Sequence, residues 1–267
     1  MLDQLTSNTV VHLKFFARSR LLLALAVIVV AMTAVGVVPA LLMSSAIGRF
    51  EQLRMLVSMF ASTTLLLTSS LGLLAAAAHI RGRTVRMVLT RPCLPEVWLA
   101  SIFIAGVLVI AALHLLMAIA TIAASLAWGV PYQTGFAFIA VDAFCRALIW
   151  FGWATALGVA FHPVVAALVA LFFNEGTLYG VKFIVASSAQ ASGGSWPFAV
   201  MGRVADAVYM AVPMVTPFAQ KTEDIYSSLR TVRSDWVVLV QIMGYTVLAM
   251  AFFFCVSDLI LRRRPLA

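Results

Sequence analysis

The stretch "HIRGRTVRMVLTRPCLPEVW", residues 79–98, carries four arginines and one histidine between two long apolar runs. The rest of the chain is poor in charge: of its 267 residues 63% are hydrophobic and 10% are charged, and the mean hydropathy is +1.06. A water-soluble domain of this length cannot cover so much apolar surface with polar groups. The composition therefore predicts an all-α protein that crosses a membrane several times.

The apolar runs give the number of crossings. A helix needs about 20 apolar residues to cross roughly 30 Å of hydrocarbon, so runs without charge are candidate spans. We predict a single transmembrane domain over residues 1–267 with six transmembrane helices, at about 21–46, 56–78, 97–128, 136–161, 164–188 and 236–261. The polar stretch 189–235 is predicted to be an extracytoplasmic loop, and its apolar middle, 204–219, an interfacial or re-entrant helix.

The positive charges predict which side of the membrane each segment faces. With both termini in the cytoplasm, ten lysines and arginines lie in cytoplasmic segments and six in outer ones, as membrane insertion favours. We therefore predict a multi-pass protein of the cell (inner) membrane with both termini in the cytoplasm. Anionic membrane lipids are a sufficient partner for the net charge of +8, and we expect no nucleic acid.

Residues 1–20 are predicted to form an interfacial helix that lies flat on the inner surface. A soluble tail that precedes a membrane anchor is the alternative. In the predicted helix the apolar side holds Leu2, Leu5, Leu13 and Phe16, and the polar side holds Gln4, Asn8, His12, Lys14 and Arg18.

Residues 79–96, between the second and third spans, are predicted to hold a short cytoplasmic amphipathic helix. Val85, Val88 and Leu89 have the spacing of one helical face, arginines frame that face, and Pro92 ends it. An apolar stripe framed by positive charge suits docking to a soluble partner. The alternative is a loop whose arginines only fix the topology.

Four charged residues fall inside predicted spans. Asp142 and Arg146 are four residues apart, the spacing of an ion pair on a helix, whereas Glu175 and Lys182 are seven apart. Charge inside a membrane is costly, so all four are candidates for the lining of a polar pathway. Structural ion pairing is the alternative.

Small residues in the fourth span predict close helix packing. Gly152 with Ala156, and Ala154 with Gly158, have the four-residue spacing that lets helix backbones approach one another in a membrane. The serines and threonines of the second span suit either such a packed bundle or a wet pathway.

No pattern in the sequence indicates catalysis or metal binding on this chain. The three cysteines and four histidines lack metal-ligand spacing, and no nucleophile motif occurs, so we expect no catalytic residue, no metal and no cofactor. None of the three lysines follows a glycine-rich phosphate loop. If the protein is a pump, ATP and magnesium bind to a separate subunit.

The segment 79–96 resembles the coupling helix of the membrane subunits of ABC export systems. In that family the second span is followed by a run of the form R-x-x-G-T-x-x-x-L-L-x-x-P-x-x-R, which docks to the ATPase. Arg81, Gly82, Thr84, Leu89, Arg91 and Pro92 look like that run, although Arg83 separates Gly82 from Thr84. The segment "PFAQKTEDIYSSL", residues 217–229, also resembles a proline-then-D-x-Y stretch of some relatives.

This resemblance implies a permease subunit of an ATP-driven exporter. It implies two permease halves, identical or paralogous, and cytoplasmic ATP-binding subunits. The expected ATPase-docking residues are Arg81, Gly82, Thr84, Val85, Arg86, Val88, Leu89, Arg91 and Pro92. A non-transporting membrane scaffold and an intramembrane enzyme are the alternatives, and the cargo stays open.

Overall fold

The computed structural model describes residues 2–19, 46–80, 94–131, 133–172, 180–181, 183–188, 196–211 and 231–263, with residues 27, 31 and 225. All regular structure in these residues is helical, and no strand occurs among them, which confirms the all-α prediction for the described part. The helices are α1 (Leu2–Arg18), α3 (Ala46–Ile80), α5 (Pro95–Trp128), α6 (Thr134–Ala160), α7 (Pro163–Phe172), α9 (Trp196–Ala211) and α11 (Arg233–Arg263).

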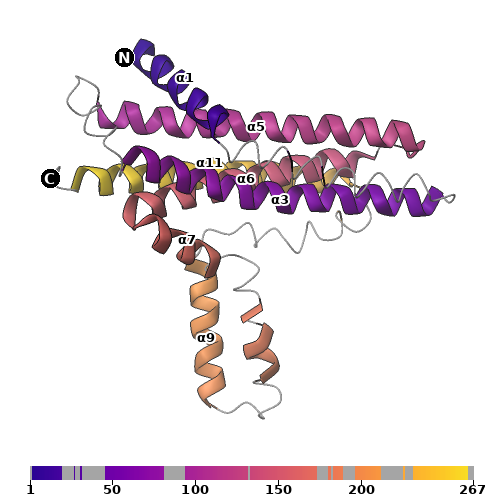
Figure 1. Ribbon diagram of the computed structural model, residues 1–267. Coiled ribbons are helices and arrows are strands. Elements are labelled where there is room, and N and C mark those ends of the chain that lie inside the picture. Colours follow the sequence, from indigo (N-terminus) through magenta and orange to yellow (C-terminus); the bar gives the residue numbers. More distant parts are fainter. Residues whose placement is uncertain are drawn as a thin grey trace.

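Four of these helices, α3, α5, α6 and α11, are long and apolar enough to cross a membrane. They lie side by side in a bundle (Figure 1) and correspond to the predicted second, third, fourth and sixth spans. The predicted first span, 21–46, lies outside the described residues except for Val27, Ala31 and Ala46. The count of six spans therefore stays a prediction.

Local sequence signals fix where the long helices begin and end. α5 begins with Pro95, whose missing N–H costs nothing in the first turn. It ends at Trp128 and is capped by Gly129, which adopts the left-handed conformation with φ 64°. At the start of α11 the backbone N–H of Val232 donates to Asp235 Oδ2 at 2.7 Å. Arg262 and Arg263 in its last turn complement the helix dipole.

One end of the bundle gathers α1, the end of α3, the start of α5 and the end of α11; we call it the α1 end. The ring of His12 on α1 meets the ring of Trp98 on α5 edge to face, with centroids 5.9 Å apart. Arg262 of α11 pairs with Glu96 of α5 at the same end. Both chain termini lie towards this end (Figure 1).

The opposite end, which we call the Trp128 end, is closed by polar contacts between helices. Arg49 of α3 donates from Nη1 to the carbonyl oxygen of Trp128, the last residue of α5, at 2.9 Å. The hydroxyl oxygens of Thr134, where α6 begins, and Thr231 lie 2.6 Å apart. α3, α6 and α11 therefore run from the Trp128 end to the α1 end, and α5 runs the opposite way.

Small residues allow α3 and α6 to touch along their length. A Cβ atom added to Gly158 would lie 2.4 Å from the Cβ of Ala76, and one added to Gly72 would lie 2.7 Å from the carbonyl oxygen of Phe151. Gly152 faces the other way, towards Phe253 of α11. The close packing predicted for the small residues of the fourth span is confirmed.

α1 packs on the start of α5 through a face that includes the predicted apolar residues Leu13 and Phe16 and also the predicted polar residue His12. Thr9, His12 and Phe16 are buried there, whereas Leu2 is 77% exposed. The prediction that His12 belongs to the polar, outward side is therefore wrong, because its ring fits against Trp98. Val10 and Val11 face outward instead, so α1 keeps a second apolar face away from the bundle.

The predicted fifth span, 164–188, is described only in part. α7 begins at Pro163 and packs on α6 and α3, with Ala166 and Ala170 buried beside Leu157. Residues 183–188 are helical and lie beside α9, where a Cβ on Gly202 would be 4.0 Å from Val185 Cγ1. α9 points away from the bundle (Figure 1), so this part does not follow the axis of the four long helices.

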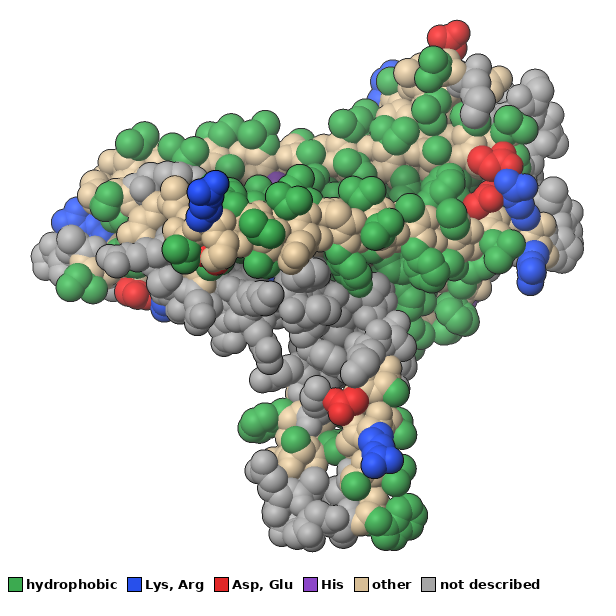
Figure 2. Space-filling view, turned by 180° about the vertical axis from the view of Figure 1, so that it is seen from behind, with side chains coloured by type: hydrophobic (Ala, Val, Ile, Leu, Met, Phe, Trp, Pro, Cys, Tyr) green, Lys and Arg blue, Asp and Glu red, His purple; other side chains and the backbone are tan. Residues whose placement is uncertain are grey.

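The surface agrees with a bundle that lies across a membrane. Figure 2 shows hydrophobic side chains along the length of the bundle and charged side chains gathered towards its two ends. Large apolar residues of α5 and α11 face outward, among them Leu115, Leu126, Val247, Leu248 and Phe252. An exposed apolar band of this kind is what lipid chains cover.

Candidate functional site

A buried ion pair on α6 is the centre of the candidate site. Arg146 donates from Nε to Asp142 Oδ2 at 2.9 Å, across one turn of the helix. The side chain of Asp142 is fully buried and that of Arg146 is 23% exposed. The four-residue spacing predicted this pair, and the structure confirms it.

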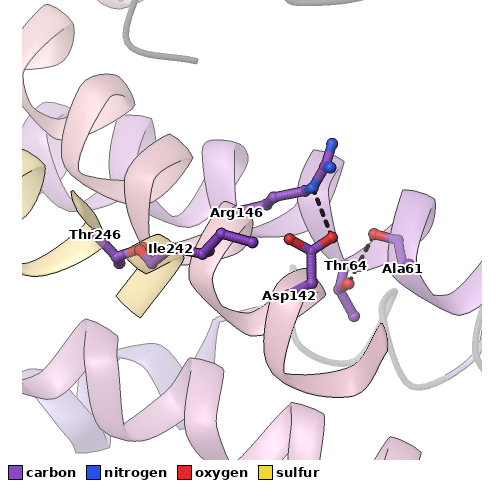
Figure 3. A network of polar contacts seen from close by, with 6 residues as sticks. All are labelled: Ala61, Thr64, Asp142, Arg146, Ile242 and Thr246. Carbon is purple, nitrogen blue, oxygen red and sulfur yellow. Dashed lines mark hydrogen bonds and ion pairs between the residues drawn. The ribbon is translucent and has the colours of Figure 1, made fainter. Parts of the chain in front are cut away.

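Threonines from the neighbouring helices flank the pair (Figure 3). Thr64 of α3 donates to the carbonyl oxygen of Ala61 at 3.0 Å, as Figure 3 shows, and to that of Phe60 at 2.9 Å. Thr246 of α11 donates to the carbonyl oxygen of Ile242 at 2.8 Å. Both hydroxyls are buried, and each donates its hydrogen to a carbonyl of its own helix. Towards the bundle interior they can therefore act only as hydrogen-bond acceptors.

α5 contributes His114 to the same region. This residue is buried, its Nδ1 lies 2.9 Å from the carbonyl oxygen of Ile110, and its ring meets that of Phe144 on α6 at 5.5 Å. A histidine bonded to its own helix and packed edge to face on an aromatic ring has the contacts of a core residue. The hydrogen bond to its own helix and the ring contact with Phe144 give His114 a structural role in the bundle interior.

The arrangement can hold charge inside the bundle without net charge. A carboxylate in a low-dielectric interior is tolerated when a cation and hydrogen-bond donors face it, and Asp142 has Arg146 at contact distance. The pair therefore joins two residues one turn apart on α6, the helix that α3, α5 and α11 all contact. A structural role accounts for this geometry; a role in a polar pathway stays a prediction.

A second polar cluster lies at the α1 end, and sequence reasoning missed it. Arg262 donates from Nε to Asp258 Oδ2 at 2.8 Å and also pairs with Glu96 Oε1, 166 residues away in sequence. This cluster fastens the end of α11 to the start of α5. The sequence signal was an acidic first turn on one helix and a basic last turn on another, which does not name a partner.

All of the remaining predicted site residues lie outside the described residues. These are the candidate pathway residues Glu175 and Lys182, and all nine docking residues, Arg81, Gly82, Thr84, Val85, Arg86, Val88, Leu89, Arg91 and Pro92. The structure describes Ile80 and Leu94, the residues that bracket residues 81–93. Within the described part, His, Cys, Asp and Glu side chains form no group of three that could hold a metal.

No protein-family model matches this chain, and no curated protein matches it. Function is therefore inferred from the sequence pattern, the fold and these contacts.

Proposed function

We propose that this protein is the transmembrane permease subunit of an ATP-driven ABC transporter, an exporter that forms half of a translocation path. A separate cytoplasmic subunit binds and hydrolyses ATP, and a second permease copy or a paralogue supplies the other half. The proposal rests on the four helices that are long and apolar enough to cross a membrane, and on the resemblance of residues 79–96 to a coupling helix.

The observation that carries the proposal is where the basic connection is anchored. α3 ends at Ile80 and α5 begins at Pro95, both at the α1 end of the bundle. The chain between them, which holds four arginines, joins two membrane-length helices at the end towards which both termini point. A motor that moves this connection acts directly on two of the four long helices.

The polar cluster at the α1 end would spread such a movement. Glu96 is the second residue of α5 and pairs with Arg262 near the end of α11. The start of α5 also carries Trp98, against which α1 packs through His12. A shift at the start of α5 is therefore passed to α11 and to α1 through side-chain contacts that the structure describes.

Changing Val88 and Leu89 to Asp tests the docking role. The double variant replaces two apolar side chains of the predicted docking face with charges, so the ATP-binding subunit should no longer co-purify with the permease. The chain and the product of a neighbouring ATP-binding gene are expressed together and purified in mild detergent, and ATPase activity is measured.

The matched control is Val88→Ile with Leu89→Met, which keeps both positions apolar and should keep the partner bound. Insertion is checked in both variants by the yield of folded, membrane-extracted protein. An unchanged ATPase stimulation in the Asp variant contradicts the coupling role. So does a parent chain that never retains an ATP-binding subunit.

A non-transporting membrane scaffold is the second candidate, and α9 is the observation in its favour. This helix points away from the bundle (Figure 1) and exposes Trp196, Val200 and Val204. An apolar helix that projects from a membrane protein can recruit a partner. ATP-dependent transport by reconstituted protein excludes the scaffold, and partner binding through α9 without any ATPase dependence favours it.

A further inference from the structure

A groove of mixed polarity lies at the Trp128 end of the bundle, apart from the buried ion pair. It encloses about 590 Å³ between α3 and α6. Its walls carry both signs of charge and an apolar floor, and include Glu51, Arg54, Met55, Ser58, Met59 and Ile139. A groove with this lining suits a molecule that has a charged end and an apolar end.

The charged wall consists of an exposed ion pair. Arg54 Nη2 lies 2.9 Å from Glu51 Oε2, and the two side chains are 39% and 51% exposed. An ion pair this open to solvent contributes little to stability, so exchanging its partners costs little. A zwitterion that enters the groove can place its anionic group on Arg54 and its cationic group on Glu51. Each side chain then exchanges one opposite charge for another.

The order of the two charges along α3 selects one kind of zwitterion. Arg54 follows Glu51 by three residues, which places it about 4.5 Å further from the helix start and deeper in a membrane. A phospholipid headgroup has the same order, with its phosphate next to the acyl chains and its ammonium group further out. Guanidinium binds phosphate and carboxylate binds ammonium, so both ends match in sign and in depth.

The apolar part of the groove continues from this pair towards the bundle centre. Arg54 is the last charged residue of α3, and Met55 and Met59 follow it along the helix. Ile139 is the one residue of α6 among the lining residues that the structure describes, and its side chain is almost fully buried. Thioether side chains are flexible enough to fit a chain of varying length, so this floor suits the upper part of an acyl chain.

We propose that this groove binds a zwitterionic phospholipid, with its phosphate on Arg54 and its ammonium group on Glu51. Phosphatidylglycerol offers the same phosphate to Arg54 but has a neutral glycerol in place of the ammonium group, so Glu51 would lose its opposite charge, which disfavours this lipid. The inference needs only that the four long helices cross a membrane. It does not depend on ATP-driven transport.

The test measures lipid retention by the purified full-length chain with native mass spectrometry. Phosphatidylethanolamine and phosphatidylglycerol of identical acyl chains are added to the detergent-solubilised protein in equal amounts. The parent chain should retain phosphatidylethanolamine in preference.

The decisive variant is the charge swap E51R/R54E. It keeps the net charge and the possibility of an ion pair, but it places a carboxylate at the depth of the phosphate. Retention of phosphatidylethanolamine should fall about ten-fold or more, the loss expected for a charge-assisted bond replaced by repulsion. The swap E96R/R262E at the α1 end is the control for a charge swap away from the groove. It also places a carboxylate beside Asp258, so retention is compared per amount of folded protein and should be unchanged.

Filling the groove provides a second variant that does not alter charge. Met59→Trp should lower the retention of both lipids, and the intrinsic fluorescence of the variant shows whether it has folded. Equal retention by the parent chain and the E51R/R54E variant overturns the proposal. So does a loss of the same size in the E96R/R262E control.

Soluble phosphoethanolamine distinguishes a lipid from a small zwitterion. It lacks acyl chains and should not displace the lipid at an equal concentration. If it displaces the lipid at that concentration, the groove binds the free headgroup as well as it binds the lipid. That result overturns the lipid assignment. Failure of this site would leave ATPase docking through Val88 and Leu89 untouched, because in the sequence these residues fall between α3 and α5, whose adjoining ends lie at the α1 end.

Discussion

α6 and α11 are both long enough to cross a membrane, yet their surroundings differ. Of the most apolar window of α6, 72% is buried inside the protein, against 28% of that of α11. α6 meets its neighbours through Gly152, Ala154 and Gly158, whereas α11 turns Val247 and Leu248 outward. α6 is thus the central helix of the bundle, and α11 is a peripheral helix with an exposed apolar face.

This difference shows what holds helices together when lipid replaces water. Lipid chains are as apolar as leucine, so burial of apolar area gives little drive for one helix to join another. Close backbone approach at small residues and internal polar bonds supply the stability instead. α6 has both of these features, and substitutions on it should therefore cost far more than matched ones on α11.

The largest effect is expected from Gly158→Leu. A Cβ at this position would lie 2.4 Å from the Cβ of Ala76, so a leucine has to push α3 and α6 apart. We expect the free energy of unfolding to fall by about 3 kcal/mol or more, and the yield of folded protein to be low. Thermal unfolding in mild detergent, followed by tryptophan fluorescence, measures this loss.

Gly244→Leu on α11 is the matched control for that substitution. A Cβ on Gly244 meets nothing within 4 Å, so the leucine side chain has room. This variant should unfold within a few degrees of the parent chain. Equal losses in the two variants would mean that α6 is no more tightly packed than α11.

The next largest effect is expected from Asp142→Asn. The substitution keeps the size of the side chain but leaves the Arg146 guanidinium beside a neutral group inside the bundle. Losing one partner of a buried pair costs about 3 kcal/mol. Asp258→Asn on α11 makes the same change at the end of the bundle and should cost less than about 1 kcal/mol.

A double variant distinguishes pairing from other roles of Asp142. D142N combined with Arg146→Gln removes both charges, so part of the loss seen in the single variant should return. If the stability loss of the double variant equals the sum of the losses of the two single variants, the 2.9 Å contact between Arg146 and Asp142 contributes nothing to stability as a pair.

A smaller effect is expected at the α1 end. Arg262→Gln removes the pairs with Glu96 and Asp258, which involve partly exposed side chains. The loss of stability should be about 1 kcal/mol at low salt and should shrink at high salt. Arg263→Gln removes one charge from the next residue and serves as the control for a change in net charge.

The smallest effect, of opposite sign, is expected from Gly244→Ala. Alanine loses less backbone freedom than glycine when a helix forms, and the added methyl group has room on α11. The variant should gain about 0.5 kcal/mol. The same change at Gly158 should be destabilising, because there the methyl group meets Ala76.

The sequence predicted the limits of α5, α6 and α11 closely, because polarity sets them. It placed the start of the second span at 56, whereas α3 begins at Ala46, because Arg49, Glu51 and Arg54 interrupt the apolar run without ending the helix. The third span, predicted at 97–128, is α5 (Pro95–Trp128), and the fourth, predicted at 136–161, is α6 (Thr134–Ala160). The Asp142–Arg146 pair was predictable for a similar reason, since both partners lie on one helix with a fixed four-residue spacing.

Contacts between helices that are distant in sequence could not be predicted. His12 is polar, and only the position of Trp98 beside it explains why it is buried. Glu96 and Arg262 are 166 residues apart, and each alone is an ordinary helix-end charge. Helical periodicity orders residues around one helix axis but does not specify the neighbour that each face meets.

The helix within the long polar stretch was predicted in the right region but too late in the chain. The apolar run 204–219 suggested its position, whereas α9 (Trp196–Ala211) begins earlier; residues 212–219 of the predicted helix lie outside the described residues. Pro197 lies at its start, where proline is favoured, and this signal is stronger than the onset of the apolar run. Hydropathy alone marks the apolar run, whereas the position of Pro197 marks where the helix begins.

Sidedness labelling tests the central claim, that the α1 end faces the cytoplasm and offers residues 79–96 to a motor. In a background with Cys93, Cys145 and Cys255 replaced, single cysteines are introduced: R86C in the connection between α3 and α5, and S234C at the start of α11. Intact cells are then treated with a membrane-impermeant maleimide. We expect S234C to be labelled and R86C to be labelled only after the membrane is opened; labelling of R86C in intact cells would contradict the claim.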